Sequence, residues 1–169
     1  MFNGKLVIAD ASLCQSPPDA CLSLEELCAR TPGEKRLLLD NRAGKQEGFC
    51  NNHKLEGKAS IGGATGIFRA GKREGLWKVY LPSGKLTENR NYLTGKLDGI
   101  NESFDEKGNL SQKHYYNKDV LVKVQSLKSG RVDTETVFSY REDGVTAKSA
   151  EIFKKGKRIR KIDYGKSVK

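Results

Sequence analysis

Four cysteines and two histidines are the side chains of this sequence best suited to metal binding, redox chemistry or acid–base catalysis. Cys14, Cys21, Cys28 and Cys50 all lie in the first third of the chain. An even number of cysteines in so short a segment is typical of two disulfides formed in an oxidising compartment. Zinc is the alternative, because His53 follows Cys50 closely. No two cysteines have the gap of about two to four residues that zinc sites favour, so we expect disulfides and no metal.

The pairing of the four cysteines is left open by the sequence, since any of three connectivities is possible. We favour Cys14–Cys21 together with Cys28–Cys50. The first bridge would close a short loop around Pro17-Pro18, and the second would tie a helix to the sheet. A reactive thiol is not expected, because the sequence has no Cys-x-x-Cys motif.

No arrangement of residues predicts an enzyme. His53 and His114 fall in different copies of an internal repeat, so a catalytic or metal-binding pair is not expected. The sequence has neither a Gly-x-Ser-x-Gly elbow nor a phosphate-binding loop. Gly62-Gly63-Ala64-Thr65-Gly66 is rich in glycine, but no helical pattern follows it, and we interpret it as a turn or bulge between strands. We expect no catalytic residues and no cofactor.

The internal repeat organises most of the chain into strands and glycine turns. Five positions recur 24 residues later: Gly75, Tyr80, Gly84, Leu86 and Tyr92 are followed by Gly99, Phe104, Gly108, Leu110 and Tyr116. The pattern Gly-Lys-x-acid-Gly also occurs three times, beginning at Gly44, Gly71 and Gly95. Glycine suits turns in which the backbone takes a positive φ. The spacing predicts a mainly β fold, a curved antiparallel meander of repeated β-hairpins.

Alternation along the strands predicts which side chains share a face. Leu76, Lys78 and Tyr80 should point one way, and Trp77 and Val79 the other. Extending the alternation through the next repeat predicts a polar centre on one face, made of Lys78, Glu88, Arg90, Glu102 and His114.

The N-terminal segment differs from the repeats. Lys5–Ala9 reads as an apolar strand, and the prolines between Asp10 and Ala20 predict a loop. Ser23 and Glu26 have the order of a capping box, which predicts a short helix from Leu24 to about Arg30. We expect two parts: residues 1–35, a cysteine-rich strand and helix cap tied by disulfides, and residues 36–165, the hairpin repeat domain.

Composition gives the chain a strongly basic surface. It has 169 residues, a formal net charge of +10, 36% hydrophobic residues and a mean hydropathy of −0.64. The charge fits either a well-solvated repeat surface or attraction to an acidic protein or phospholipid. Nucleic acid is disfavoured, because basic residues alternate with acidic ones and no binding motif is present. No apolar run is long enough to span a membrane, and no signal-peptide pattern follows Met1.

The repeat resembles a known family. Gly75-Leu76-Trp77-Lys78-Val79-Tyr80, followed by Ser83-Gly84-Lys85-Leu86 and Tyr92-Leu93-Thr94-Gly95-Lys96, is similar to the MORN-variant repeat. The resemblance is best over residues 42–120 and partial to about 157. The next copy departs from it, with Asn101 in place of the tryptophan and Asp119 in place of the final glycine. The resemblance implies a curved hairpin sheet in a bacterial antitoxin-like or immunity protein, and related repeats serve in membrane and protein scaffolding.

Together these features predict a binding protein rather than an enzyme. We expect an immunity protein of the bacterial periplasm, exported with its signal peptide absent from this sequence. It would neutralise a secreted antibacterial toxin, such as a lipase, by occluding it. The partner-binding residues that we expect are Trp77, Lys78, Arg90, His114 and Tyr115, facing an acidic surface of the toxin. A position in the core is the alternative for Trp77 and Tyr115, because large aromatic side chains are usually mostly buried. Alternatives are an envelope scaffold protein that binds anionic lipid and a hydrolase with an unrecognised site. The sequence leaves the oligomeric state open.

Overall fold

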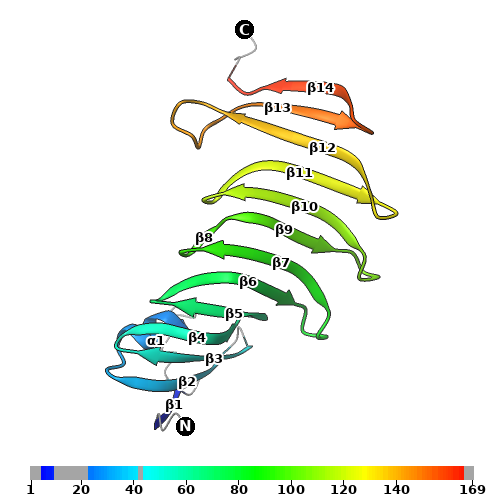
Figure 1. Cartoon of the computed structure of the whole chain (residues 1–169). Helices are drawn as coiled ribbons and strands as arrows, with labels where there is room; N and C mark the ends of the chain where they lie inside the picture. Colours follow the sequence, from blue (N-terminus) through cyan, green and yellow to red (C-terminus); the bar gives the residue numbers. More distant parts are fainter. Residues whose placement is uncertain (1–4, 10–22, 42–43, 166–169) are drawn as a thin grey trace. The chain divides into compact units, whose positions relative to one another are not determined.

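The computed structural model describes residues 5–9, 23–41 and 44–165 (Figure 1). The chain divides into two compact units, residues 1–84 and residues 85–169, here called unit 1 and unit 2. The expected boundary between residues 35 and 36 does not separate these units, because the helix and the first strand belong to the same unit as the strands that follow them.

Unit 1 is a sheet with one short helix. Its elements are β1 (Lys5–Ala9), α1 (Leu24–Ala29), β2 (Glu34–Asn41), β3 (Gly44–Asn51), β4 (Lys54–Ile61), β5 (Ala64–Arg69) and β6 (Lys72–Tyr80). The strands follow one another in the sheet in chain order. All described pairs in this unit are antiparallel except β1 with β2, which run parallel. The predicted strand at the N-terminus is therefore present, and its parallel pairing is an addition that the hairpin pattern did not indicate.

Unit 2 is a meander of strands. Its elements are β7 (Leu86–Leu93), β8 (Lys96–Leu97), β9 (Gly99–Phe104), β10 (Leu110–Asn117), β11 (Val120–Lys128), β12 (Arg131–Tyr140), β13 (Ala147–Lys154) and β14 (Lys157–Asp163). The order is β7-β9-β10-β11-β12-β13-β14, with the two-residue β8 paired to β7. Every described pair is antiparallel. The predicted fold class, an antiparallel meander of hairpins with a short disulfide-tied helix, is confirmed.

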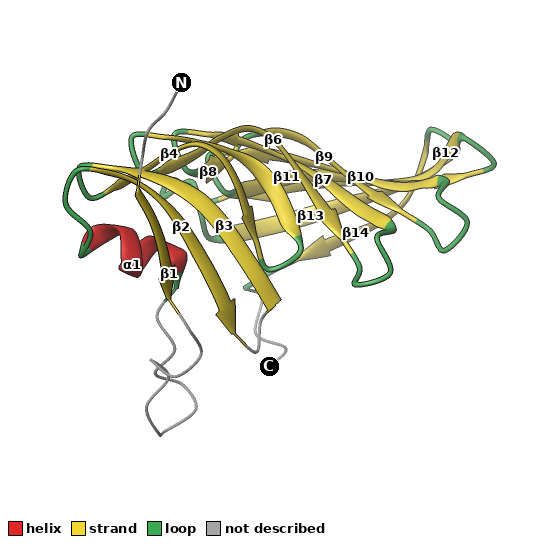
Figure 2. Cartoon of the chain, turned by 90° about the horizontal axis from the view of Figure 1, so that it is seen from below, coloured by secondary structure: helices red, strands yellow, loops and turns green. Residues whose placement is uncertain are grey.

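Helix α1 packs on one face of the sheet in unit 1 (Figure 2). Its capping box is formed: the Glu26 amide donates to the Ser23 hydroxyl at 3.1 Å, and the Ser23 amide donates to the Glu26 carboxylate at 2.7 Å. These hydrogen bonds lower the pKa of Glu26. Leu24 and Cys28 are buried against the sheet, and Leu27 is half-buried.

The predicted Cys28–Cys50 disulfide is confirmed. It joins α1 to β3, with 5.5 Å between the two Cα atoms. The other predicted bridge, Cys14–Cys21, lies outside the described residues. Since the confirmed bridge closes a loop of 22 residues, it restricts the unfolded chain and stabilises the helix on the sheet by roughly 3 kcal/mol.

The core of unit 1 is centred on Trp77 of β6. Its side chain is 1% exposed, and its ring meets Phe68 edge to face with 5.2 Å between centroids. The indole N–H donates to the Ile67 carbonyl oxygen at 3.1 Å, so burial leaves no polar atom unpaired. A Cβ on Gly66 would lie 2.2 Å from the Trp77 ring. Glycine at position 66 therefore makes room for the tryptophan.

Turn glycines behave as predicted at the two Gly-Lys-x-acid-Gly copies whose turns lie wholly within the described residues. Ala70-Gly71 and Thr94-Gly95 are two-residue turns with positive φ at both positions, 51° and 77°, then 51° and 87°. Gly48, which ends the first copy, lies within β3 and has no positive φ. A Cβ on Gly48 would lie 2.9 Å from the Leu24 side chain. Glycine at position 48 leaves room for the side chain of Leu24, which belongs to helix α1.

The prediction that Glu102 belongs to the polar centre is wrong. In the β9–β10 pair, Phe104 lies opposite Leu110, but Ser103 lies opposite Gln112, so Ser111 is an extra residue in the ladder. One extra residue reverses which side chains of β10 share a face with β9. Glu102 therefore pairs with Lys113, and His114 lies on the opposite face.

Candidate functional site

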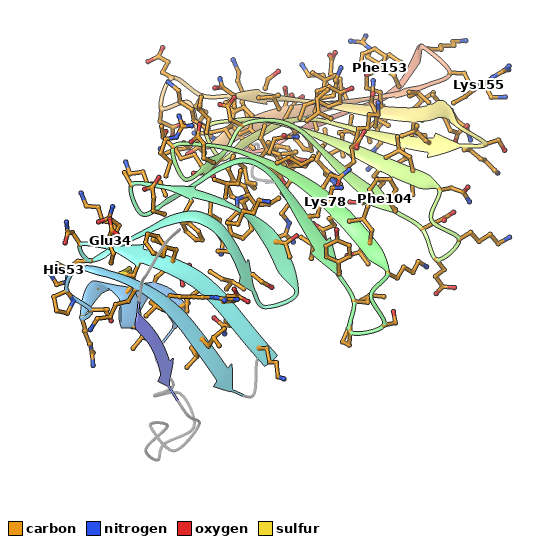
Figure 3. The ribbon with its side chains drawn as sticks, turned by 60° about the horizontal axis from the view of Figure 1, so that its bottom comes forward. Glu34, His53, Lys78, Phe104, Phe153 and Lys155 are labelled. Carbon is orange, nitrogen blue, oxygen red and sulfur yellow. A yellow bond between two sulfur atoms is a disulfide. The ribbon has the colours of Figure 1, made fainter. Side chains whose placement is uncertain are left out.

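Within each unit, the predicted partner-binding residues do not share one face. Trp77 belongs to the core of unit 1 and has no surface to offer a partner. Lys78, the next residue of β6, is exposed on the opposite face of the strand (Figure 3). The predicted alternation of Trp77 and Lys78 is thus confirmed, and Trp77 is corrected from a surface anchor to a core residue.

Arg90 and His114 share one face of unit 2. Glu88, two residues before Arg90, lies opposite Ser103 in the ladder, and Asn101, on the face of Ser103, lies opposite His114. Arg90 donates from Nε to the Glu88 carboxylate at 2.7 Å, which raises the pKa of Arg90. Because this guanidinium is already paired, its charge is partly compensated before any partner arrives.

Tyr115 lies on the opposite face of unit 2, in a network of hydrogen bonds across β10, β11 and β12. Its hydroxyl donates to Gln125 Oε1 at 2.8 Å, and Gln125 Nε2 donates to Glu135 Oε2 at 2.6 Å. Lys123 Nζ lies 3.6 Å from Glu135 Oε2 and 4.1 Å from the centroid of the Tyr115 ring. We call Tyr115, Lys123, Gln125 and Glu135 the Tyr115 network.

Strand register places these four side chains together. Tyr115 lies opposite Lys123, and Gln125 lies opposite Glu135. Cross-strand neighbours on one face of an antiparallel pair are in direct contact, and each such pair contributes up to about 1 kcal/mol. The cation over the aromatic ring and the two hydrogen bonds fix the ring and the amide in one orientation. The Tyr115 network is thus an ordered, half-buried polar and aromatic surface.

Sequence reasoning found Tyr115 but missed its three partners. Lys123, Gln125 and Glu135 lie beyond residue 120, where the repeat motif fades. The sequence signal that could have identified them is the alternation along Val120–Lys128 and Arg131–Tyr140. Polar side chains two residues apart on a strand lie on the same face of the sheet.

The 24-residue spacing that the sequence shows between Tyr92 and Tyr116 extends to two further tyrosines. Tyr92, Tyr116, Tyr140 and Tyr164 are each 24 residues apart, at or beside the ends of β7, β10, β12 and β14. Burial raises the pKa of the Tyr140 hydroxyl, and the neighbouring Tyr116 and Tyr164 raise it further. Tyr140 donates from its hydroxyl to the Leu121 carbonyl oxygen. The repeat therefore continues to the end of the described chain in these tyrosines, after its glycine pattern has decayed.

Histidine 53 has a local role. It is the second residue of the β3–β4 turn, with a φ of 68°, and its Nδ1 lies 2.9 Å from the Ala29 carbonyl oxygen (Figure 3). The contact links the turn to the end of α1. Among the described residues no group of three or more histidine, cysteine, aspartate or glutamate side chains could hold a metal ion.

Two comparisons with known proteins give no match for this chain. No protein-family model matches it, and a search of curated proteins finds no significant similarity. Within the described residues, no helix is long and apolar enough to cross a membrane.

Proposed function

We propose that this protein binds another protein through its open sheet faces and occludes it. The observation that carries the proposal is the Tyr115 network on unit 2. Tyrosine and charged side chains held in place before binding lose little conformational entropy when a partner covers them. A sheet built of neighbouring hairpins is also a suitable support, because strand pairing holds each side chain in position.

The most specific form of the proposal is an immunity protein. The resemblance to MORN-variant repeats implies this class, and the confirmed Cys28–Cys50 disulfide fits an oxidising compartment such as the periplasm. The partner would be a secreted antibacterial toxin, such as a lipase. A net charge of +10 favours a toxin with an acidic surface and an association that weakens as salt concentration rises.

The test uses the product of the gene next to the one that encodes this chain. Under the proposal, that product is toxic when sent to the periplasm, the full chain rescues growth, and the two proteins copurify. Replacing Tyr115→Ala together with Gln125→Ala should weaken binding by about tenfold or more. Tyr164→Ala is the matched control, since Tyr164 is an exposed tyrosine outside the network.

A neighbouring product that is harmless, or whose toxicity persists beside this chain, contradicts the immunity proposal. Sedimentation of the chain with anionic vesicles, in place of copurification with a protein, would instead support the envelope scaffold alternative. The double variant must keep the wild-type far-UV circular dichroism and Trp77 fluorescence, which together show that the strands of unit 2 and the core of unit 1 are intact.

A further inference from the structure

The open face of unit 1 carries a hollow that the sequence did not predict. A groove of about 440 Å³ lies over β4, β5 and β6 on the face opposite Trp77 and α1. We call it the β4–β6 groove, and six of its lining side chains matter here: Lys58, Ser60, Thr65, Ile67, Leu76 and Lys78.

Two irregularities in the strand pairing accompany the groove. On β6, the residues from Gly75 to Trp77 lie opposite the single residue Gly66 of β5. On β4, the residues from Gly57 to Ala59 lie opposite the single residue Gly48 of β3. Extra residues on one strand bend it and redirect its side chains. On β6 this irregularity carries Trp77 inward over Gly66, while Leu76, the preceding residue, points to the open face.

The floor of the groove is apolar and exposed. Ile67 is 47% exposed and Leu76 is 46% exposed, and both line the same hollow. Two large aliphatic side chains gathered in a concave site gain free energy when another apolar group covers them, at about 25 cal/mol for each Å² removed from water. The hydroxyl groups of Ser60 and Thr65 stand beside them and can donate or accept hydrogen bonds.

The charge around the floor is positive. Lys58 lies opposite Ile67 in the ladder, and Lys78 lies opposite Thr65. Both lysines are exposed, and neither forms an ion pair with a described residue. The nearby carboxylate of Glu47 is already held by Arg36, whose Nε donates to it at 2.8 Å. Glu74 lies opposite Ile67 on the same face. The groove therefore combines an apolar floor with two lysines that form no ion pair with a described residue, and with a carboxylate at its edge.

We propose that the β4–β6 groove binds an acidic loop of the partner protein, which places an apolar side chain on Ile67 and Leu76 and carboxylates beside Lys58 and Lys78. This proposal rests on the protein-binding function proposed above and assigns it a site in unit 1. Charge complementarity selects this occupant. A second copy of the chain is disfavoured, since each copy carries a net charge of +10.

The probe is a short fluorescein-labelled peptide in which leucine and phenylalanine are flanked by aspartate and glutamate. Fluorescence polarisation with the full chain should show saturable binding that weakens with added salt. A peptide with glutamine in place of the acids, and one with glycine in place of the apolar residues, should each bind at least about tenfold more weakly.

Matched variants locate the site. Leu76→Ser should weaken peptide binding by about tenfold, because it removes apolar contact area, and Lys78→Glu should do the same by reversing a charge. Leu93→Ser is the control for the first, since Leu93 is 49% exposed and lies in unit 2. Lys128→Glu is the control for the second. All four side chains are exposed. Unchanged Trp77 fluorescence shows that the two variants of unit 1 fold, and unchanged far-UV circular dichroism shows the same for the two controls in unit 2.

Several results would overturn the proposal. Three concern the peptide: no saturable binding, an equal loss of affinity in the control variants, or undiminished affinity for the glutamine peptide. Two point to another occupant: anionic vesicles that bind wild type and not the Leu76→Ser variant, or self-association of the chain that Leu76→Ser abolishes. Mapping peptide-induced NMR shifts on the wild-type chain gives an independent answer, since shifts confined to other residues also refute it. If the groove variants still rescue cells from the toxin, the groove assignment fails while the immunity function stands. If wild type does not rescue but the peptide result holds, the immunity function fails instead.

Discussion

Unit 1 and unit 2 are built from the same kind of hairpin, yet they bury their side chains in different ways. In unit 1, α1 covers one face, and a disulfide ties it there. Of the buried apolar side chains among the described residues, all lie in unit 1 except Ala150. In unit 2 no described helix covers either face, and most strand side chains are half-buried by their neighbours on adjacent strands.

The difference separates two sources of stability. Unit 1 has a conventional hydrophobic core, so its stability should depend on a few large side chains. Unit 2 depends on ladder hydrogen bonds and cross-strand pairs, each of small free energy and spread over many residues. A binding surface made of half-buried polar side chains, such as the Tyr115 network, is available only where no core covers the face.

The largest expected effect comes from Trp77→Ala. Removing a fully buried aromatic side chain should lower the free energy of unfolding of unit 1 by about 3–5 kcal/mol. Hydrogen exchange followed by mass spectrometry during urea titration would report each unit separately. Amides of β2–β6 should lose protection at lower urea, while those of β10–β13 change little.

Tyr115→Ala is the matched control in unit 2, where the aromatic ring is only half-buried. This substitution should lower the free energy of unfolding of unit 2 by about 1 kcal/mol, the value of a cross-strand pair or one hydrogen bond. If the two aromatic substitutions destabilise their units equally, the contrast between a cored unit and a coreless unit is wrong.

The second effect tests the disulfide. Replacing Cys28→Ser and Cys50→Ser together should lower the unfolding free energy of unit 1 by about 3 kcal/mol, since the unfolded chain regains the freedom of the closed loop. Urea titration followed by Trp77 fluorescence measures unit 1 alone, because the chain has a single tryptophan.

Far-UV circular dichroism of the same sample serves as the control for unit 2. Since every cysteine of the sequence precedes residue 85, the unfolding transition of unit 2 should not move. A single transition that shifts as a whole would show that the two units unfold together.

The contrast also marks how far sequence reasoning reached. Local signals predicted local structure: the Ser23–Glu26 capping box, the turns at Gly71 and Gly95, and the opposite faces of Trp77 and Lys78 are all present. Each depends on residues close together in the chain, for which backbone preference and alternation are sufficient.

The errors arose where a single extra residue changes the register. The bulge at Ser111 moved His114 away from Glu102, and no pattern in the sequence marks a bulge there. The irregularities opposite Gly48 and Gly66, where three residues face one, likewise accompany the β4–β6 groove. At these two glycines the side chains of Leu24 and Trp77, which are distant in sequence, pack closely on the backbone. The β4–β6 groove is therefore defined by tertiary packing and could not be read from the local sequence pattern.

The smallest expected effect concerns two aspartates in turns of unit 2 and the pH dependence of the stability that they contribute. The Asp105 carboxylate accepts hydrogen bonds from the Asn109 and Lys107 amides at 2.8 and 2.9 Å, and Asp143 accepts from the Thr146 and Val145 amides at 2.8 and 2.9 Å. Hydrogen bonds from Asn109 lower the pKa of Asp105, and those from Thr146 lower the pKa of Asp143. A lowered pKa in the folded state means that the unfolded chain binds the proton more readily.

The stability from these two carboxylates is therefore fully present above the ordinary aspartate pKa of about 3.9 and is lost as the pH falls through the lower folded values. Asp105→Asn keeps an oxygen that accepts the two backbone-amide hydrogen bonds. It removes the charge and the oxygen that accepts from Asn109 Nδ2 at 3.2 Å. Its midpoint of thermal unfolding should lie slightly below that of wild type at neutral pH and converge with it in acid. Glu106→Gln, in the same turn, is the control, since its carboxylate accepts no hydrogen bond from a described residue. A difference between wild type and Asp105→Asn that persists unchanged into acid would show that charge at this turn contributes nothing, leaving unit 2 to depend on its uncharged ladder contacts alone.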